Sequence, residues 1–71
     1  MTRPDRLIAM ANQIARFFDS QREGAAGAAN HLTRYWDPAM RAEIIAWRRG
    51  GGDGLAPLAA QAVDTLIDAA P

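Results

Sequence analysis

The chain has 71 residues, no cysteine and one histidine, and its eight basic and eight acidic side chains give a formal net charge of zero. This length allows a single small domain over residues 1–71, with a modest core that is marginally stable unless a partner supports it. The composition excludes a disulfide framework, a zinc–thiolate site and the usual multi-histidine metal sites. The balanced charge also gives no bulk attraction to nucleic acid or to a membrane.

The first predicted helix begins at residue 4 or 5 and ends at residue 19 or 20. Its apolar side chains recur at helical spacing in one stripe: Leu7, Ala11, Ile14 and Phe18. Two further pairs widen this stripe on its two sides: Ile8 with Ala15, and Met10 with Phe17. Such a wide apolar arc is typical of a core helix touched from two sides, or of a helix that leaves one of these edges for a partner. Met10 and Phe17 are the candidate partner-binding residues on this helix.

A second helix is predicted from Ala25 to Trp36, after a break at residues 21–24. Its apolar side chains form a compact arc: Ala25, Ala28, Ala29, Leu32, Tyr35 and Trp36. The small residues at its start allow another helix to approach closely, whereas Gly27 inside it costs about 1 kcal/mol relative to alanine. His31 lies beside the arc, which indicates a helix-flank histidine with a half-covered ring. No second group in the sequence supports a role for it as a ligand or in proton transfer.

The corner between the second and third helices contains Asp37 and Pro38. Asp37 is a good N-cap, because its carboxylate can accept hydrogen bonds from the free N–H groups of the next turn. Pro38 suits the first helical position and disfavours helical geometry at the residue before it, so the preceding helix ends there. Large aromatic side chains at this corner are expected to pack under both helices. The predicted structural corner consists of His31, Tyr35, Trp36, Asp37 and Pro38.

The third helix is predicted from residue 38 to residue 48 or 49. Its apolar side chains fall into two groups, a stripe and one residue well round the helix from it: Met40, Ile44 and Trp47, then Ile45. Arg41 and Arg48 share one face between these groups, about two turns apart. They either lay their stems on apolar surface with their heads in water, or form an interface, because Arg and Trp often dominate binding energy. The candidate partner-binding residues of this helix are Arg41, Arg48, Trp47 and Ile45.

Residues 49–54 form a predicted flexible linker that contains four glycines. A phosphate-binding P-loop is excluded, since Leu55 and Ala56 stand where that motif needs Lys and Ser or Thr. A fourth helix is predicted from residue 56 or 57 to residue 69, and it either completes the bundle or docks on another protein. The predicted fold is all-α, with a small three-helix unit and a fourth C-terminal helix after the linker.

Three stretches of the chain resemble one known family. They are Leu7-Ile8-x-Met10-Ala11-Asn12-Gln13-Ile14-Ala15-x-Phe17-Phe18, then Tyr35-Trp36-Asp37-Pro38-x-Met40-Arg41 with His31 one turn upstream, and Gly54-Leu55-x-Pro57-Leu58. In this order, and in a chain of similar length, they resemble the delta subunit of NAD-dependent, molybdenum-containing formate dehydrogenases. The first two stretches are fairly specific in combination, whereas the third is weak by itself.

The resemblance implies a non-catalytic accessory subunit of a complex that oxidises formate to carbon dioxide and reduces NAD⁺. In that family the molybdenum cofactor, the iron–sulfur clusters and the FMN belong to the larger subunits. This chain is expected to hold none of them, and it has no cysteine with which to bind a cluster. The expected partners are the larger subunits, the catalytic alpha subunit first. Stabilising the assembled enzyme and helping cofactor insertion both fit such a role.

Other functions have weaker support. No nucleophile–base pair can be named, and so short a chain hardly encloses a substrate pocket, which argues against an enzyme. A helix-turn-helix DNA-binding module has suitable helix lengths, but the zero net charge and the acidic Asp37 and Glu43 oppose it. A free-standing homodimeric bundle stays an alternative. The opening residues lead into an amphipathic helix rather than a signal peptide, and no apolar run reaches membrane-spanning length, so we expect a cytoplasmic chain.

Overall fold

The computed structural model describes residues 3–69, and these residues form four α-helices and no strand. The helices are α1 (Asp5–Phe18), α2 (Ala25–Tyr35), α3 (Pro38–Arg49) and α4 (Pro57–Ala69). The predicted all-α fold and the four predicted helices are confirmed, and each helix ends close to its predicted residue. The domain predicted over 1–71 also includes residues 1, 2, 70 and 71, which lie outside the described part of the chain.

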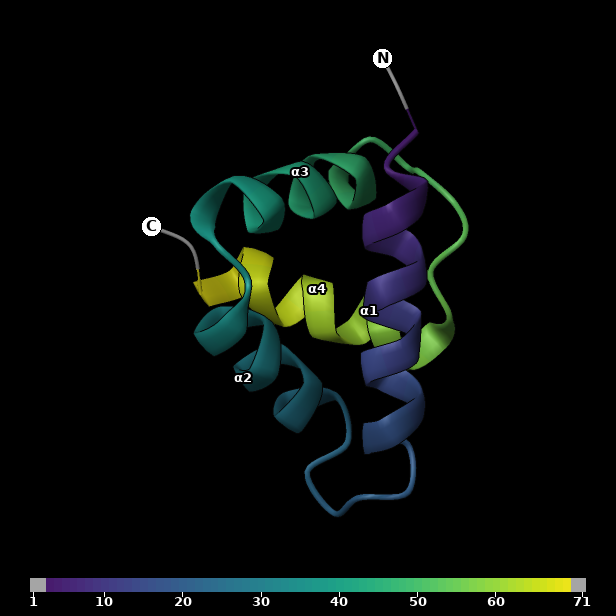
Figure 1. Cartoon of the computed structure of the whole chain (residues 1–71), viewed down its shortest axis with the longest axis vertical. Helices are drawn as coiled ribbons and strands as arrows, with labels where there is room; N and C mark the ends of the chain where they lie inside the picture. The colour runs from purple at the N-terminus through teal and green to yellow at the C-terminus, as the bar shows by residue number, and fades with distance from the viewer. Residues whose placement is uncertain (1–2, 70–71) are drawn as a thin grey trace.

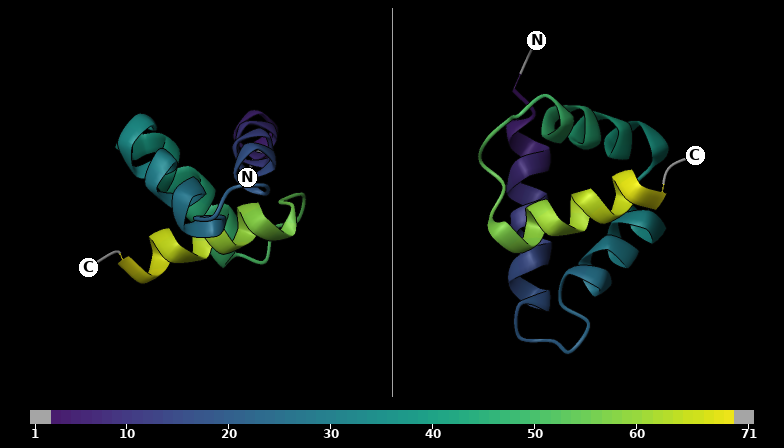
Figure 2. Two further views of the ribbon diagram at one scale, coloured as in Figure 1. Left: turned by 90° about the horizontal axis from the view of Figure 1, so that it is seen from below. Right: turned by 180° about the vertical axis from the view of Figure 1, so that it is seen from behind.

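The fourth helix holds the other three together (Figure 1). It lies behind α1 and α2 in that view and contacts α1, α2 and α3, most extensively α2. Figure 2 shows that α1 and α2 diverge like the two arms of a V from the loop that joins them. The fourth helix, α4, runs across one face of this V. Of the two roles that the sequence left open for the last helix, α4 therefore completes the bundle.

The core lies where α2 packs against α4, because small side chains let these two helices approach closely. Ala28 and Ala29 of α2 and Ala59 and Ala62 of α4 are all buried. The largest fully buried side chains come from three different helices: Leu32, Ile44 and Val63. No polar or charged side chain is buried among residues 3–69, so apolar burial supplies the stability of this core.

The corner before α3 forms as predicted at its cap. The Asp37 carboxylate accepts a hydrogen bond from the backbone N–H of Met40 at 2.9 Å, and Pro38 stands at the start of α3. The indole of Trp36 packs into the core and is only 5% exposed. The expectation that the corner aromatics pack under both helices is wrong for Tyr35, which is 70% exposed. The Tyr35 ring lies beside the His31 ring, and no described helix covers it.

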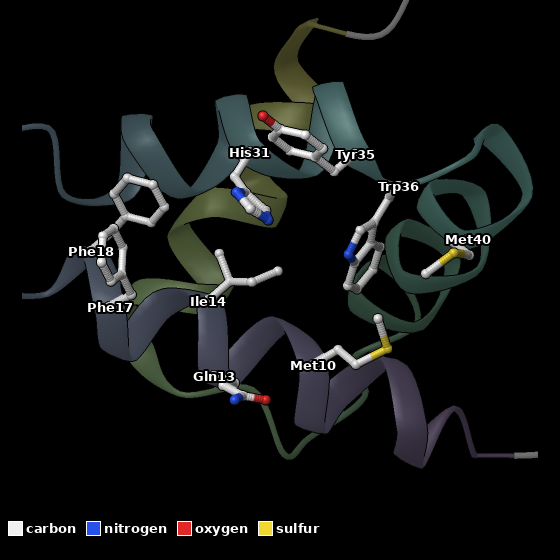
Figure 3. Close-up of a pocket in the computed structure, with 9 residues that line it drawn as sticks. All are labelled: Met10, Gln13, Ile14, Phe17, Phe18, His31, Tyr35, Trp36 and Met40. Carbon is white, nitrogen blue, oxygen red and sulfur yellow. The ribbon is translucent and has the colours of Figure 1, made fainter.

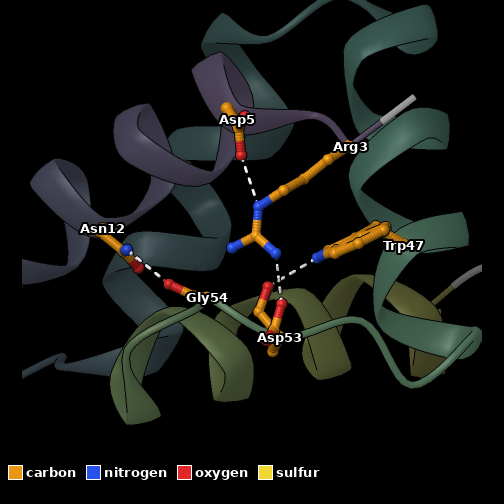
Figure 4. Close-up of polar contacts among 6 residues, drawn as sticks. All are labelled: Arg3, Asp5, Asn12, Trp47, Asp53 and Gly54. Carbon is orange, nitrogen blue, oxygen red and sulfur yellow. Dashed lines mark hydrogen bonds and ion pairs between the residues drawn. The ribbon is translucent and has the colours of Figure 1, made fainter.

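The glycine-rich linker is tied to the rest of the chain at several points (Figure 4). Trp47 donates from Nε1 to the backbone oxygen of Asp53 at 2.8 Å, and Arg3 pairs with the Asp53 carboxylate at 2.5 Å. The Asn12 side-chain amide donates to the backbone oxygen of Gly54 at 2.9 Å, and its oxygen accepts from the backbone N–H of Ala56 at 2.8 Å. The glycine content predicted flexibility here, and it gave no sign of these ties.

Gly54 is required at its place in the linker. Its φ of +99° lies in a backbone region that residues other than glycine rarely adopt. A Cβ there would lie 2.6 Å from Nη2 of Arg3 and 3.2 Å from Cγ2 of Ile8. The linker can therefore lie close against the start of α1 only because this residue has no side chain.

Candidate functional site

An open groove runs between α1 and α2, with α4 behind it in the view of Figure 3. Its volume is about 600 Å³. The α1 wall consists of five side chains: Met10, Gln13, Ile14, Phe17 and Phe18. The opposite wall and one end come from α2, the corner and α3: His31, Tyr35, Trp36 and Met40. The groove is therefore mostly apolar and aromatic, and neither a carboxylate nor a thiol lines it.

The structure decides which edge of α1 is open. Ile8 and Ala15 are buried in the core, so that edge is covered by the chain itself. Met10 is half-buried, and Phe17 at the rim of the groove is 63% exposed. Among the described residues, Phe17 and Tyr35 are the exposed large hydrophobic side chains, and both line this groove. Clustered exposure of this kind is typical of an interaction surface.

Aromatic rings from α1 and α2 meet along the groove. The rings of Phe17 and Phe18 are 5.0 Å apart and edge-to-face, and His31 lies 6.2 Å from Phe18 and 4.6 Å from Tyr35. Gly27 permits this arrangement, because a Cβ at that position would lie 2.7 Å from Cδ1 of Phe18. Sequence reasoning counted Gly27 only as a cost to its helix, since the ring beside it comes from another helix.

Arg48 of α3 forms a bidentate ion pair with Asp64 of α4. Its Nε lies 2.9 Å from Oδ1, and its Nη2 lies 3.0 Å from Oδ2. Hydrogen bonding to the guanidinium holds the pKa of the Asp64 carboxyl below its ordinary value. The side chains keep 38% and 46% of their surface exposed, so the pair adds little to the stability of the α3–α4 contact.

Arg41, the other arginine on this face of α3, caps the preceding helix. Its Nη1 donates to the backbone oxygen of Thr33 at 3.1 Å and also to that of Trp36. Thr33 lies in the last turn of α2 and Trp36 is the residue that follows this helix, so no N–H of α2 is available to either carbonyl. Arg41 therefore fixes the corner from the α3 side.

The predicted partner residues of α3 thus contact their own chain. Trp47 bonds to the linker and lies under the Arg3 guanidinium, 5.4 Å from the ring centroid, and Ile45 is half-buried against the core. The spacing of apolar and arginine residues along α3 could not reveal the hydrogen bonds of Arg41 and Arg48, because their acceptors lie outside this helix. That these α3 residues also contact a partner protein stays a prediction.

A family model described as the delta subunit of NADH-dependent formate dehydrogenase, FdsD, matches residues 6–63 of the chain. The chain belongs to this family. Comparisons with curated proteins and with solved structures gave no match. The family inferred from the three sequence stretches is confirmed.

The residues on which the resemblance to the delta-subunit family was based converge on the groove. All nine side chains that line it lie in the two longer stretches, counting His31 with the second. The first stretch supplies the α1 wall, and the second supplies the opposite wall and the end. The third stretch touches the first, since Asn12 holds the backbone of Gly54. Three separate parts of the sequence thus build one surface and the tie beside it.

The described part of this delta-subunit family member contains no group of three or more His, Cys, Asp or Glu side chains placed to hold a metal ion. None of its helices between residues 3 and 69 is both long and apolar enough to span a bilayer. The groove offers ring faces, methyl groups and a few hydrogen-bonding groups, a composition that is typical of protein interfaces.

Proposed function

We propose that the chain is a non-catalytic accessory subunit of a cytoplasmic formate dehydrogenase, and that its groove binds a larger subunit of that enzyme. In this proposal the catalytic alpha subunit is the partner, and the larger subunits hold the molybdenum cofactor, the iron–sulfur clusters and the FMN. The observation that carries the proposal is the groove itself, which leaves Phe17 and Tyr35 exposed on a chain of only 71 residues.

Docking would complete the apolar V of α1 and α2, which α4 covers on one side only. A partner that fills the groove gains roughly 25 cal/mol for each Å² of apolar surface that it covers. A chain this small is marginally stable by itself, so binding would also stabilise its fold. By linkage, the chain stabilises whichever state of the partner it binds.

The direct test is co-purification of a tagged chain from cells that also express the larger subunits. We expect the larger subunits in stoichiometric amounts, in an enzyme that carries its cofactors. Recovery with a cofactor-free catalytic subunit alone would assign the chain to enzyme assembly rather than to the finished complex. Recovery of no larger subunit would contradict the proposal.

Two neighbouring substitutions on α1 test whether the groove is the contact surface. Phe17 lines the groove, whereas Arg16 is exposed on another side of the helix, beside Asn12 and Asp19. Phe17→Asn and Arg16→Asn place the same polar residue on the same helix. We expect Phe17→Asn to weaken binding about thirtyfold, as for the loss of an aromatic anchor, and Arg16→Asn to leave it unchanged. Equal binding by the two variants would place the interface outside the groove.

A further inference from the structure

The indole nitrogen of Trp36 is the most informative polar group in the groove. Trp36 is only 5% exposed, yet no residue in the range 3–69 accepts a hydrogen bond from its Nε1. Every fully buried side-chain polar atom in that range has a partner, so this nitrogen reaches solvent, and Trp36 lines the groove. Figure 3 shows the nitrogen on the edge of the ring that faces His31 and Ile14. Trp36 thus presents one directed N–H donor to whatever fills the groove.

The other tryptophan shows what is missing at Trp36. Trp47 is more exposed, but its Nε1 donates to the backbone oxygen of Asp53 at 2.8 Å. A tryptophan N–H that becomes fully buried normally has an acceptor, because covering it without one loses its bond to water. An entirely apolar occupant of the groove would therefore bind at a penalty.

The chain itself supplies no charged acceptor in the groove. The polar groups on its walls besides Trp36 are Gln13, His31 and the Tyr35 hydroxyl, and no carboxylate is among them. Beside the groove, Arg34 and Glu23 both line the hollow that shares His31 and Tyr35 with it, so the charges there balance. The Trp36 N–H on the wall itself, with no carboxylate on that wall, therefore favours an occupant that brings an oxygen acceptor.

We infer that the groove receives an apolar helix of a larger formate dehydrogenase subunit, and that this helix carries one carboxylate, which bonds to the Trp36 N–H. This inference rests on the proposed function. A helix fits because the groove lies between two splayed helices, and such grooves accept a third helix by its apolar face.

A second copy of the chain fits the groove less well than a helix of a larger subunit. In a two-fold contact both copies would present the same N–H donors, and neither would bring a carboxylate from its groove. The groove also has nine lining residues, whereas a stable interface of standard size uses about 20–30 residues on each side. The groove is therefore too small to form a dimer interface alone, and in a complex with a larger subunit it would be one contact within a wider interface.

One atomic substitution tests the hydrogen bond. A 71-residue chain can be made by chemical synthesis, so the Trp36 indole can be replaced by a benzothiophene, in which sulfur takes the place of N–H. The probe is the formate dehydrogenase complex purified without this chain. We expect about fivefold weaker binding with an unchanged melting temperature of the free chain. The same replacement at Trp47 is the matched control, and it should leave the affinity unchanged.

The two indole N–H signals in a ¹H–¹⁵N NMR spectrum give a second readout that a purely structural role of Trp36 would not affect. In the free chain the Trp36 N–H should exchange with water faster than the Trp47 N–H, which is already bonded within the chain. Adding the complex should shift the Trp36 signal and protect it from exchange, while the Trp47 signal keeps its position.

Each alternative gives a different result. Normal binding of the sulfur variant, with weak binding of Phe17→Asn, would keep the groove as the interface and overturn the inferred acceptor. Absence of binding to the complex by the unmodified chain would contradict the proposed function itself. Dimerisation of the free chain with protection of the Trp36 N–H would show that a second copy fills the groove, and the inference would be wrong.

Discussion

The linker side of the molecule and the groove side each contain a tryptophan, and they use it differently. On the linker side Trp47 donates to Asp53, and Arg48 pairs with Asp64, so these groups bond within the chain. On the groove side Phe17 is exposed and the Trp36 N–H has no acceptor among the described residues. Residue types that often dominate interfaces therefore indicate an interface only where their own chain leaves them unbonded.

The largest expected effect comes from removing each indole in turn. Trp36→Ala should lower the free energy of unfolding by about 3–5 kcal/mol, which is most of the stability of a domain this small. Trp47→Ala should cost clearly less, because Trp47 is only half-buried and packs on the linker. Thermal melts followed by circular dichroism compare the two variants. Equal losses would show that the linker side is as much a part of the core as the corner.

Gly54→Ala tests the tie between the linker and α1. A side chain at φ +99° is strained, and its Cβ would lie too close to Arg3 and Ile8, so we expect a loss of roughly 1–3 kcal/mol. The same substitution at Gly50, whose φ is −79° and whose Cβ would make only ordinary contacts, is the control. If urea unfolding shows no difference between the two variants, the linker does not adopt this conformation in solution.

Arg41→Ala separates fold from binding on the α3 side. Leaving the last carbonyls of α2 without this donor should cost about 1 kcal/mol, or a fall of roughly 4–8 °C in melting temperature. Affinity for the larger subunits should stay within about twofold at a temperature where the variant is folded. Strong loss of binding by a fully folded Arg41→Ala protein would instead assign α3 to the interface, as its sequence pattern predicted.

The smallest effect concerns pH. The pKa of Asp64 is lowered in the folded chain, so its ion pair stabilises the fold above the ordinary carboxyl range, and this contribution is lost as the pH falls through the lowered pKa. Asp64→Asn should therefore melt slightly below the parent at pH 7 and match it in strong acid. A constant difference between the two proteins across this range would show that the carboxylate charge has no part in the effect.

Local signals predicted the secondary structure well. The cap at Asp37, the proline after it and the apolar spacing of each helix are properties of neighbouring residues, and the corresponding helices form. Burial of Tyr35 was wrong because nothing in its own helix tells whether another helix covers it. Periodicity shows which residues share a face, and the path of the chain decides what that face meets.

The candidate site was predicted in part. The edge formed by Met10 and Phe17 was one of two named for α1, and the structure leaves this edge open. The opposite wall was named only as a structural corner, because His31 and Tyr35 belong to a different helix from Phe17. The bonds that engage Arg41 and Arg48 have their acceptors outside α3, in the residues before it and in α4, so no pattern within α3 contains them.

The central claim is that the groove between α1 and α2, which Met40 at the start of α3 closes at one end, contacts the larger subunits, and that the rest of α3 does not. Methyl NMR tests it without any substitution, since Met10, Ile14 and Met40 line the groove while Ile45, further along α3, lies outside it. Cross-saturation from protonated formate dehydrogenase to the deuterated, methyl-labelled chain reports which methyl groups touch the partner. We expect loss of signal at Met10, Ile14 and Met40 with Ile45 unaffected. Loss at Ile45 with full signal at Met10 and Ile14 would contradict the account.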